Sequence, residues 1–129
     1  MPHLHIEYSR GLEERTDIAA LCRVAHAAII ETGLFPMAGI RIRAFAADHA
    51  IVADGLPEND FAAFTLTVGA GRSPDDLKSA GEAIFAALRD ALAGPLATEH
   101  FALSMEIRVS DPDLSWKATP IHARLSAKA

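Results

Sequence analysis

The sequence predicts an α+β fold in which two tandem β-α-β units share one mixed four-stranded sheet, with both helices on the same face. Three observations support this prediction. Apolar and polar residues alternate in four segments, which is typical of strands, and apolar residues recur at helical spacing in two others. The order strand, helix, strand occurs twice, with matching elements about 60 residues apart. The strand segments are 3–8, 40–45, 64–68 and 101–109, and the helical segments are 18–29 and 74–92.

The first unit starts with a strand at the N-terminus. Its alternation places three apolar side chains on one face and three polar ones on the other: Leu4, Ile6 and Tyr8 against His3, His5 and Glu7. Thr16 or Asp17 can cap the helix that follows, and Gly33 suits its end. The strand at 40–45 then carries its two arginines on one face, and residues 51–53 are a candidate strand that pairs back on it.

The second unit repeats this pattern with clearer boundaries. Its first strand ends in Gly69-Ala70-Gly71-Arg72, and Ser73 is placed as an N-cap with Asp76 completing the capping box. We expect Gly94-Pro95 to stop the second helix. The strand at 101–109 has the most regular alternation in the chain.

Length and composition favour one domain over residues 1–129, with pseudo-repeats at about 2–60 and 61–125. Two helices on one face leave the other face of the sheet uncovered in a monomer, which suggests that an oligomer completes the structure. The C-terminal segment 111–122 is patterned, and we expect it to pack on a neighbouring subunit or to close a pocket.

Charge and hydropathy exclude several function classes. A net charge of -5 without a run of Lys or Arg disfavours nucleic acid as a partner. The sequence has no apolar run long enough for a membrane span and no signal peptide, so we expect a cytoplasmic protein. Cys22 lies in a helical apolar pattern and is more typical of a core residue than of a nucleophile. An anionic ligand would have to be bound by a few placed arginines.

The strongest candidate catalytic group is Pro2. After removal of Met1, Pro2 would have a free secondary amine at the start of a strand, which would hold it in place. The alternative is that Met-Pro occurs by chance, because proline is simply tolerated at the first residue of a strand. From these residues alone, the chance interpretation is favoured.

Other polar motifs carry weaker signals. His3 and His5 share one face of a strand, but no third ligand has suitable spacing, so a metal site is disfavoured. Arg41 could be a solvated or interface strand residue paired with Glu106 or with an acid of a neighbouring subunit. The turn Gly69–Arg72 could be a plain strand-to-helix connection or a weak anion site at a helix N-terminus.

Several blocks, taken together, resemble the 5-carboxymethyl-2-hydroxymuconate isomerase family of the tautomerase superfamily. The most specific are Thr32-Gly33-Leu34-Phe35-Pro36-Met37-Ala38-Gly39-Ile40-Arg41 and Gly69-Ala70-Gly71-Arg72-Ser73. The likeness also includes Met1-Pro2-His3, Leu103–Ile107 and Leu114-Ser115-Trp116-Lys117. The chain departs from the family mainly on its helix surfaces and in residues 44–53.

The resemblance implies a homotrimer that needs no cofactor and converts a small anionic dienol carboxylate to its conjugated keto isomer in aromatic-compound (homoprotocatechuate) degradation. It implies that Pro2 is the proton-transferring base and that Arg41 and Arg72 bind the substrate. Arg43 fits the pattern less well. With the resemblance, the catalytic interpretation of Pro2 becomes the favoured one.

This chemistry suits these residue types. One group can remove the hydroxyl proton and deliver a proton to carbon if its pKa is near the working pH. An α-amino group starts at about 7.7 to 8.0, and burial and nearby guanidinium groups lower its pKa. The alternatives are a broad-specificity tautomerase, a hydratase or dehalogenase-like relative using Glu7 or Glu106 as the extra acid, and a non-catalytic trimeric binding protein.

Overall fold

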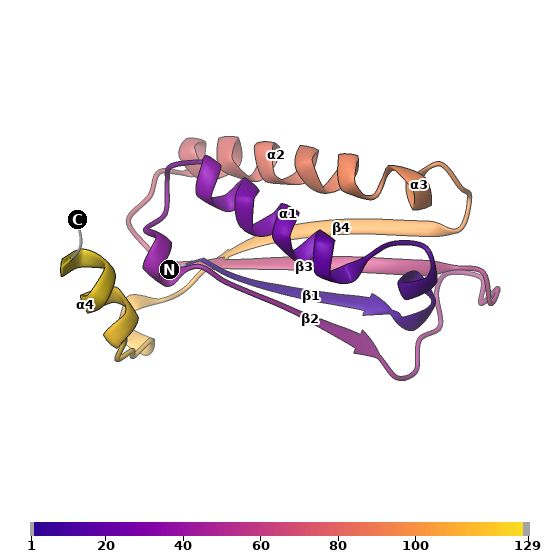
Figure 1. Ribbon diagram of the computed structural model, residues 1–129, viewed down its shortest axis with the longest axis horizontal. Coiled ribbons are helices and arrows are strands. Elements are labelled where there is room, and N and C mark those ends of the chain that lie inside the picture. The colour runs from indigo at the N-terminus through magenta and orange to yellow at the C-terminus, as the bar shows by residue number, and fades with distance from the viewer. Residues whose placement is uncertain (1, 128–129) are drawn as a thin grey trace.

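The computed structural model describes residues 2–127, which form one sheet covered by helices on one side (Figure 1). The strands lie in the order β2-β1-β3-β4. β1 pairs in parallel with β2 and antiparallel with β3, and β3 pairs in parallel with β4. The strand bounds are His3–Ser9 for β1, Arg41–Ala47 for β2, Asp60–Val68 for β3 and Phe101–Val109 for β4.

Each parallel pair is joined by a helix, as predicted. The helix α1 (Ile18–Glu31) connects β1 to β2, and α2 (Pro74–Ala91) connects β3 to β4. Figure 1 shows both helices on the same face of the sheet. The mixed sheet and the two β-α-β units are therefore confirmed. The shorter helical elements are η1 (Arg10–Glu14), η2 (Met37–Gly39), α3 (Ala93–Leu96), η3 (Pro112–Leu114) and α4 (Pro120–Ala127).

The core lies between the sheet and these two helices. Alternate residues of the central strands are fully buried, including Leu4, Ile6 and Leu66. The strand register aligns them in rows across the sheet, for example Ile42, Leu4, Leu66 and Ile107. Each fully buried aliphatic or aromatic side chain contributes roughly 1.5 to 3 kcal/mol. This packing holds the strand starts in register.

The helix starts follow their sequence signals. Asp17, one of the two candidate caps, accepts a hydrogen bond from the N–H of Ala20, and Ser73 accepts one from Asp76 at 3.1 Å. Each such cap stabilises a helix by about 1 kcal/mol. Gly33 follows α1 with a φ of 66°, which glycine adopts without steric cost.

The strand predicted at 64–68 starts four residues earlier, at Asp60. Two further boundary predictions are wrong. Residues 51–53 form no strand. The exposed Ile51 has no strand partner among the described residues, and the carbonyl of Val52 instead accepts hydrogen bonds from Gly55 and Asn59 within a loop. Local turn formation therefore replaces pairing with β2.

The second error concerns the end of α2. The helix ends at Ala91, before Gly94-Pro95, which lie inside the short helix α3. Proline is tolerated there because the first turn of a helix needs no N–H donor. Leu92, at the junction, is fully buried, which fixes the break between the two helices.

A buried polar network closes the end of the sheet where β1 finishes and β3 starts. The carboxylate of Asp60 accepts hydrogen bonds from the hydroxyl of Ser9 at 2.7 Å and from the guanidinium of Arg15 at 2.9 Å. Gly11 packs so closely on Asp60 that a Cβ at Gly11 would lie 2.6 Å from a carboxylate oxygen. Within residues 2–127, no helix is long and apolar enough to cross a membrane.

Candidate active site

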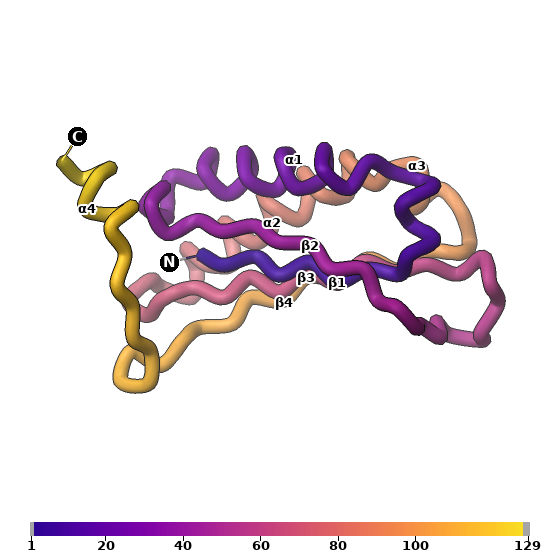
Figure 2. Tube along the Cα trace, turned by 60° about the horizontal axis from the view of Figure 1, so that its bottom comes forward, coloured from indigo at the N-terminus to yellow at the C-terminus, as the bar shows by residue number. Residues whose placement is uncertain are grey.

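The opposite end of the sheet brings the predicted site residues together. Because β1 pairs antiparallel with β3, both β1 and β2 begin at the edge where β3 and β4 finish. Pro2 therefore lies near Arg41, and the turn carrying Arg72 leaves the same edge. Figure 2 shows the C-terminal segment passing the same end of the molecule as the N-terminus.

Pro2 is fixed at this edge by burial and by the first hydrogen bond of the parallel pair. Its side chain is fully buried, and its carbonyl accepts a hydrogen bond from the N–H of Arg41 at 3.0 Å. The predicted removal of Met1 concerns a residue outside those described. While Met1 is attached, the nitrogen of Pro2 is an amide and cannot act as a base.

Arg41 is an exposed side chain whose guanidinium contacts the Nε2 atom of His3. A guanidinium can only donate hydrogen bonds, so Nε2 must be the acceptor and the His3 ring must be neutral. Burial lowers the pKa of His3, and the positive charges of Arg41, Arg43 and Lys117 lower it further. Neutral His3 thus holds Arg41 without neutralising its charge.

Arg72 is more tightly held. Its Nε donates to the carbonyl of Leu34 at 3.2 Å, and its Nη1 donates to the carbonyl of Gly69 at 3.3 Å. The guanidinium also lies over the ring of the buried Phe35, 4.6 Å from its centroid. These contacts use two of its five N–H groups, and no described residue accepts from the others. Arg72 thus joins the 34–36 loop to the sheet and keeps donors for an anion.

Two small cavities lie at this edge. Arg41 lines one cavity, of about 110 Å³, and Arg72 lines the other, of about 370 Å³. Pro36 and Lys117 line both. Among the described residues, no Asp or Glu lines either cavity, although the chain has a net charge of -5. Pro2 is not among the lining residues. The arrangement is suited to an anion with more than one acidic group.

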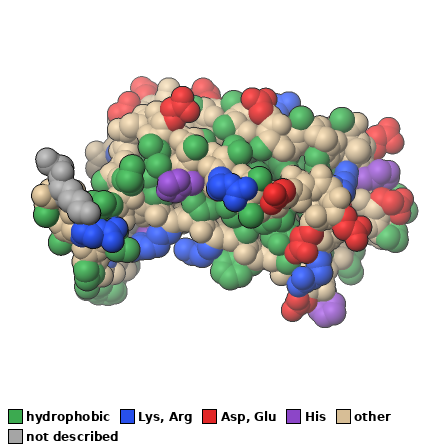
Figure 3. Space-filling view, viewed as in Figure 1, with side chains coloured by type: hydrophobic (Ala, Val, Ile, Leu, Met, Phe, Trp, Pro, Cys, Tyr) green, Lys and Arg blue, Asp and Glu red, His purple; other side chains and the backbone are tan. Residues whose placement is uncertain are grey.

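The C-terminal segment lines both cavities, in agreement with the expectation that segment 111–122 closes a pocket, although no single residue of it was predicted as a site residue. Lys117, Thr119 and His122 line the cavity of Arg41, and Ser115 and Lys117 line that of Arg72. In Figure 3, several Lys and Arg side chains gather beside this segment, whereas most visible Asp and Glu lie over the helices and at the opposite end. For Lys117 itself, the available signals were its place in this patterned segment and in a block of the family resemblance.

The remaining candidate residues are placed elsewhere. Arg43 is exposed, aligns with His5 on the open face of the sheet and lines neither cavity. Glu106 pairs with Arg108 at 2.6 Å, so its proposed pairing with Arg41 is wrong. Trp116 is 84% exposed and packs on no core residue of the described chain.

The described residues form neither a reactive thiol site nor a metal site. Burial raises the pKa of Cys22, which keeps this half-buried helix residue a thiol. Within residues 2–127, no group of three or more His, Cys, Asp or Glu side chains could hold a metal ion.

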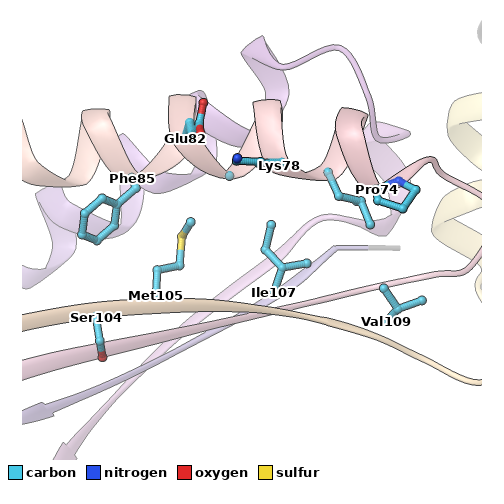
Figure 4. A pocket seen from close by; sticks show the side chains of 10 residues that line it. Pro74, Lys78, Glu82, Phe85, Ser104, Met105, Ile107 and Val109 are labelled. Carbon is cyan, nitrogen blue, oxygen red and sulfur yellow. The ribbon is translucent and has the colours of Figure 1, made fainter.

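A larger cavity, of about 770 Å³, lies away from this edge, between α2 and β4. Figure 4 shows Met105 and Ile107 pointing from β4 toward the helix and Phe85 pointing down from α2, while Ser104 points away. Lys78 and Glu82 lie along its helical side. The groove contains none of the predicted site residues, so it is not the candidate active site.

A sheet built from two β-α-β units, with a proline directly before β1 and arginines at the same edge, defines a protein of the tautomerase class. The chain matches the 5-carboxymethyl-2-hydroxymuconate isomerase family over residues 2–125, and it belongs to that family of isomerases. A curated 5-carboxymethyl-2-hydroxymuconate Delta-isomerase from Escherichia coli is 36% identical over 125 residues, which are 95% of this chain and 98% of that protein.

Solved structures agree with this assignment. The crystal structure of a 5-carboxymethyl-2-hydroxymuconate isomerase from Deinococcus radiodurans R1 has a TM-score of 0.88 at 36% identity, covering 96% of this chain and 93% of that one. A fused 4-OT symmetric trimer has a TM-score of 0.67 at 17% identity, covering 94% and 98%. The latter likeness concerns the fold alone.

Proposed function

We propose that this protein is a 5-carboxymethyl-2-hydroxymuconate Delta-isomerase whose base is the amine of Pro2 after removal of Met1. The observation that carries the proposal is 36% identity to the curated isomerase over 95% of the chain. The hydrogen bond between Arg41 and Pro2 at the cationic edge supports the roles of these residues. We assign Arg41 and Arg72 to the substrate carboxylates, and the proposed pathway is homoprotocatechuate degradation in the cytoplasm.

The reaction moves one proton within a conjugated system. The amine of Pro2 removes the proton of the enol hydroxyl, and the electrons of the broken O–H bond form the keto carbonyl. The double bonds shift, and the protonated amine returns the proton to a distant carbon, which restores the free base. Guanidinium groups on the carboxylates stabilise the intermediate dienolate, typically by roughly 3 to 4 kcal/mol per donor in a desolvated site.

The hydratase or dehalogenase-like alternative has less support. Such an enzyme needs an additional acid that activates water, and the candidates were Glu7 and Glu106. Both are exposed and lie on the open face of the sheet, and neither lines the cavities of Arg41 or Arg72. We therefore keep the isomerase as the proposed activity.

The decisive experiment follows the ultraviolet absorbance of 5-carboxymethyl-2-hydroxymuconate in the presence of purified protein. Intact mass first establishes whether Met1 is absent. We expect a kcat/KM in the ordinary enzyme range of about 10⁴ to 10⁸ M⁻¹s⁻¹, well above the values for 2-hydroxymuconate and phenylenolpyruvate. Equal weak activity on all three compounds would instead indicate a broad-specificity tautomerase. Complete inactivity of the Met1-free protein would favour a binding protein.

We further propose that the protein assembles as a homotrimer. The sheet face opposite the helices has no covering element among the described residues and carries the half-exposed Phe45. The structurally similar fused 4-OT protein is a symmetric trimer. Sedimentation equilibrium should give about three times the mass of one chain, whereas a concentration-independent monomer would contradict this assembly.

A further inference from the structure

The C-terminal segment crosses the edge of the sheet that carries the candidate site. It leaves β4 at Ser110, whose N–H donates to the carbonyl of Val68 at 2.8 Å. It then reaches Thr119, which lines the cavity of Arg41 at the start of β2. Because β4 and β2 are the two outer strands, the segment spans the whole sheet, a distance of about 14 Å. Ten extended residues can span more than about 30 Å, so the segment has ample length.

Lys117 lies in this crossing, two residues before Thr119. It is the only charged side chain of the described residues that lines both cavities, and it has no ion-pair partner among them. Its charge also lowers the pKa of His3, which follows Pro2 in the chain. Three cations from different elements are thereby collected at one edge: Arg41 from β2, Arg72 from the turn before α2, and Lys117 from the C-terminal segment.

We propose that Lys117 is a specificity-determining residue, which binds a third carboxylate of the substrate between the groups held by Arg41 and Arg72. The segment then selects tricarboxylates over dicarboxylates that share the same dienol. This inference rests on the proposed function, because the substrate named there has three carboxylates and 2-hydroxymuconate has two. An ammonium group on a flexible stem suits a carboxylate on a flexible carboxymethyl arm, whereas the planar arginine forks suit the conjugated ends.

The test compares Lys117→Met with the unchanged protein on both dienols. We expect kcat/KM for 5-carboxymethyl-2-hydroxymuconate to fall about 10- to 100-fold, which is typical of losing a charge-assisted hydrogen bond, and that for 2-hydroxymuconate to fall less than about threefold. Lys117→Arg should retain most of the discrimination. Lys78→Met, which removes the same charge from the exposed surface of α2, is the matched control and should change neither value. An equal loss on both dienols, or no loss on either, would overturn the assignment of Lys117.

Binding provides a readout independent of turnover. Trp116 is the only tryptophan of the chain, is highly exposed and precedes Lys117, so its fluorescence should report ligand binding. We expect propane-1,2,3-tricarboxylate to bind more tightly than glutarate at matched ionic strength, and Lys117→Met to remove the difference. If the protein isomerises neither dienol, the proposed function fails, and this titration alone decides the role of Lys117. Equal affinities for the two acids would then refute it.

Discussion

The backbone N–H of Arg41 donates to the carbonyl of Pro2 at 3.0 Å, so the pairing of β1 with β2 fixes the proposed base relative to a proposed substrate-binding residue. The two residues are far apart in sequence, and only the parallel register brings them together. The geometry of the site therefore depends on the fold of the whole first unit.

The first prediction concerns the free amine. Placing one serine between Met1 and Pro2 converts the nitrogen of Pro2 to an amide, which has no basic lone pair. We expect kcat/KM to fall at least about 100-fold, since general acid-base catalysis typically contributes 10² to 10⁴. Circular dichroism should show unchanged secondary structure. Full activity of the extended protein, with its mass verified, would exclude Pro2 as the base.

The second prediction separates the two arginines. Arg41→Ala and Arg72→Ala should each reduce kcat/KM by about 100-fold, because each removes a donor that stabilises the dienolate. Arg72→Ala should also lower the free energy of unfolding by about 1 to 3 kcal/mol, since two backbone carbonyls lose their donor. Urea denaturation measures this difference. Arg108→Ala, on the open face of the sheet, is the control, and near-normal kinetics in both test variants would remove the arginines from the mechanism.

The third prediction is a pH dependence of stability. The pKa of His3 is lowered from 6.5, first by burial and then by Arg41 and Arg43. Below about pH 6.5, the unfolded chain binds more protons than the folded one, so the contribution of His3 to stability is present above that pH and is lost as pH falls. Urea denaturation at about pH 5.5 and 7.5 gives the free energy of unfolding at each pH. The difference between these two free energies should be smaller in His3→Gln than in the unchanged protein. His49→Gln, in the exposed loop after β2, is the control, and identical pH differences in all three proteins would contradict the prediction.

The fourth prediction tests the polar network at the far end. Gly11→Ala places a methyl group against the carboxylate of Asp60 and should cost about 1 to 3 kcal/mol of unfolding free energy. Gly94→Ala is the matched control, because a Cβ there meets no atom within 4 Å. We expect it to be neutral or stabilising by about 0.5 to 1 kcal/mol. Equal stability of the two variants would show that the packing at Gly11 is loose.

Local patterns were sufficient for most of the fold. The alternation at 101–109 predicted β4 to the residue, and the capping signal at Ser73 located the start of α2. The loop after β2 was harder, because Ile51 and Val52 are β-branched residues typical of strands, yet turn hydrogen bonds from Gly55 and Asn59 hold them. Propensity was overridden there by contacts between neighbouring residues.

The site was less accessible to sequence reasoning. Family motifs indicated Arg41 and Arg72, but no pattern within the chain relates either to Lys117. That relationship depends on the strand order, which places the end of β4 and the start of β2 at one edge. The contact between His3 and Arg41 likewise depends on the register of a parallel pair. The role of Pro2 stays a prediction.

The antiparallel pairing of β1 with β3 gives the duplicated unit two unlike ends. The start of β3 corresponds in the second unit to the start of β1, where Pro2 lies. The chain has no free terminus at the start of β3, and the Asp60 carboxylate there accepts hydrogen bonds from Ser9 and Arg15. The two ends are separated by the length of β1, about 23 Å. Substitutions at the Asp60 end should therefore alter unfolding alone, whereas those at the Pro2 end should alter turnover, and Arg72→Ala should alter both. Because the two ends are separate, substitutions near Pro2 can change the substrate preference while the network around Asp60, which lies away from the proposed substrate site, continues to stabilise the fold.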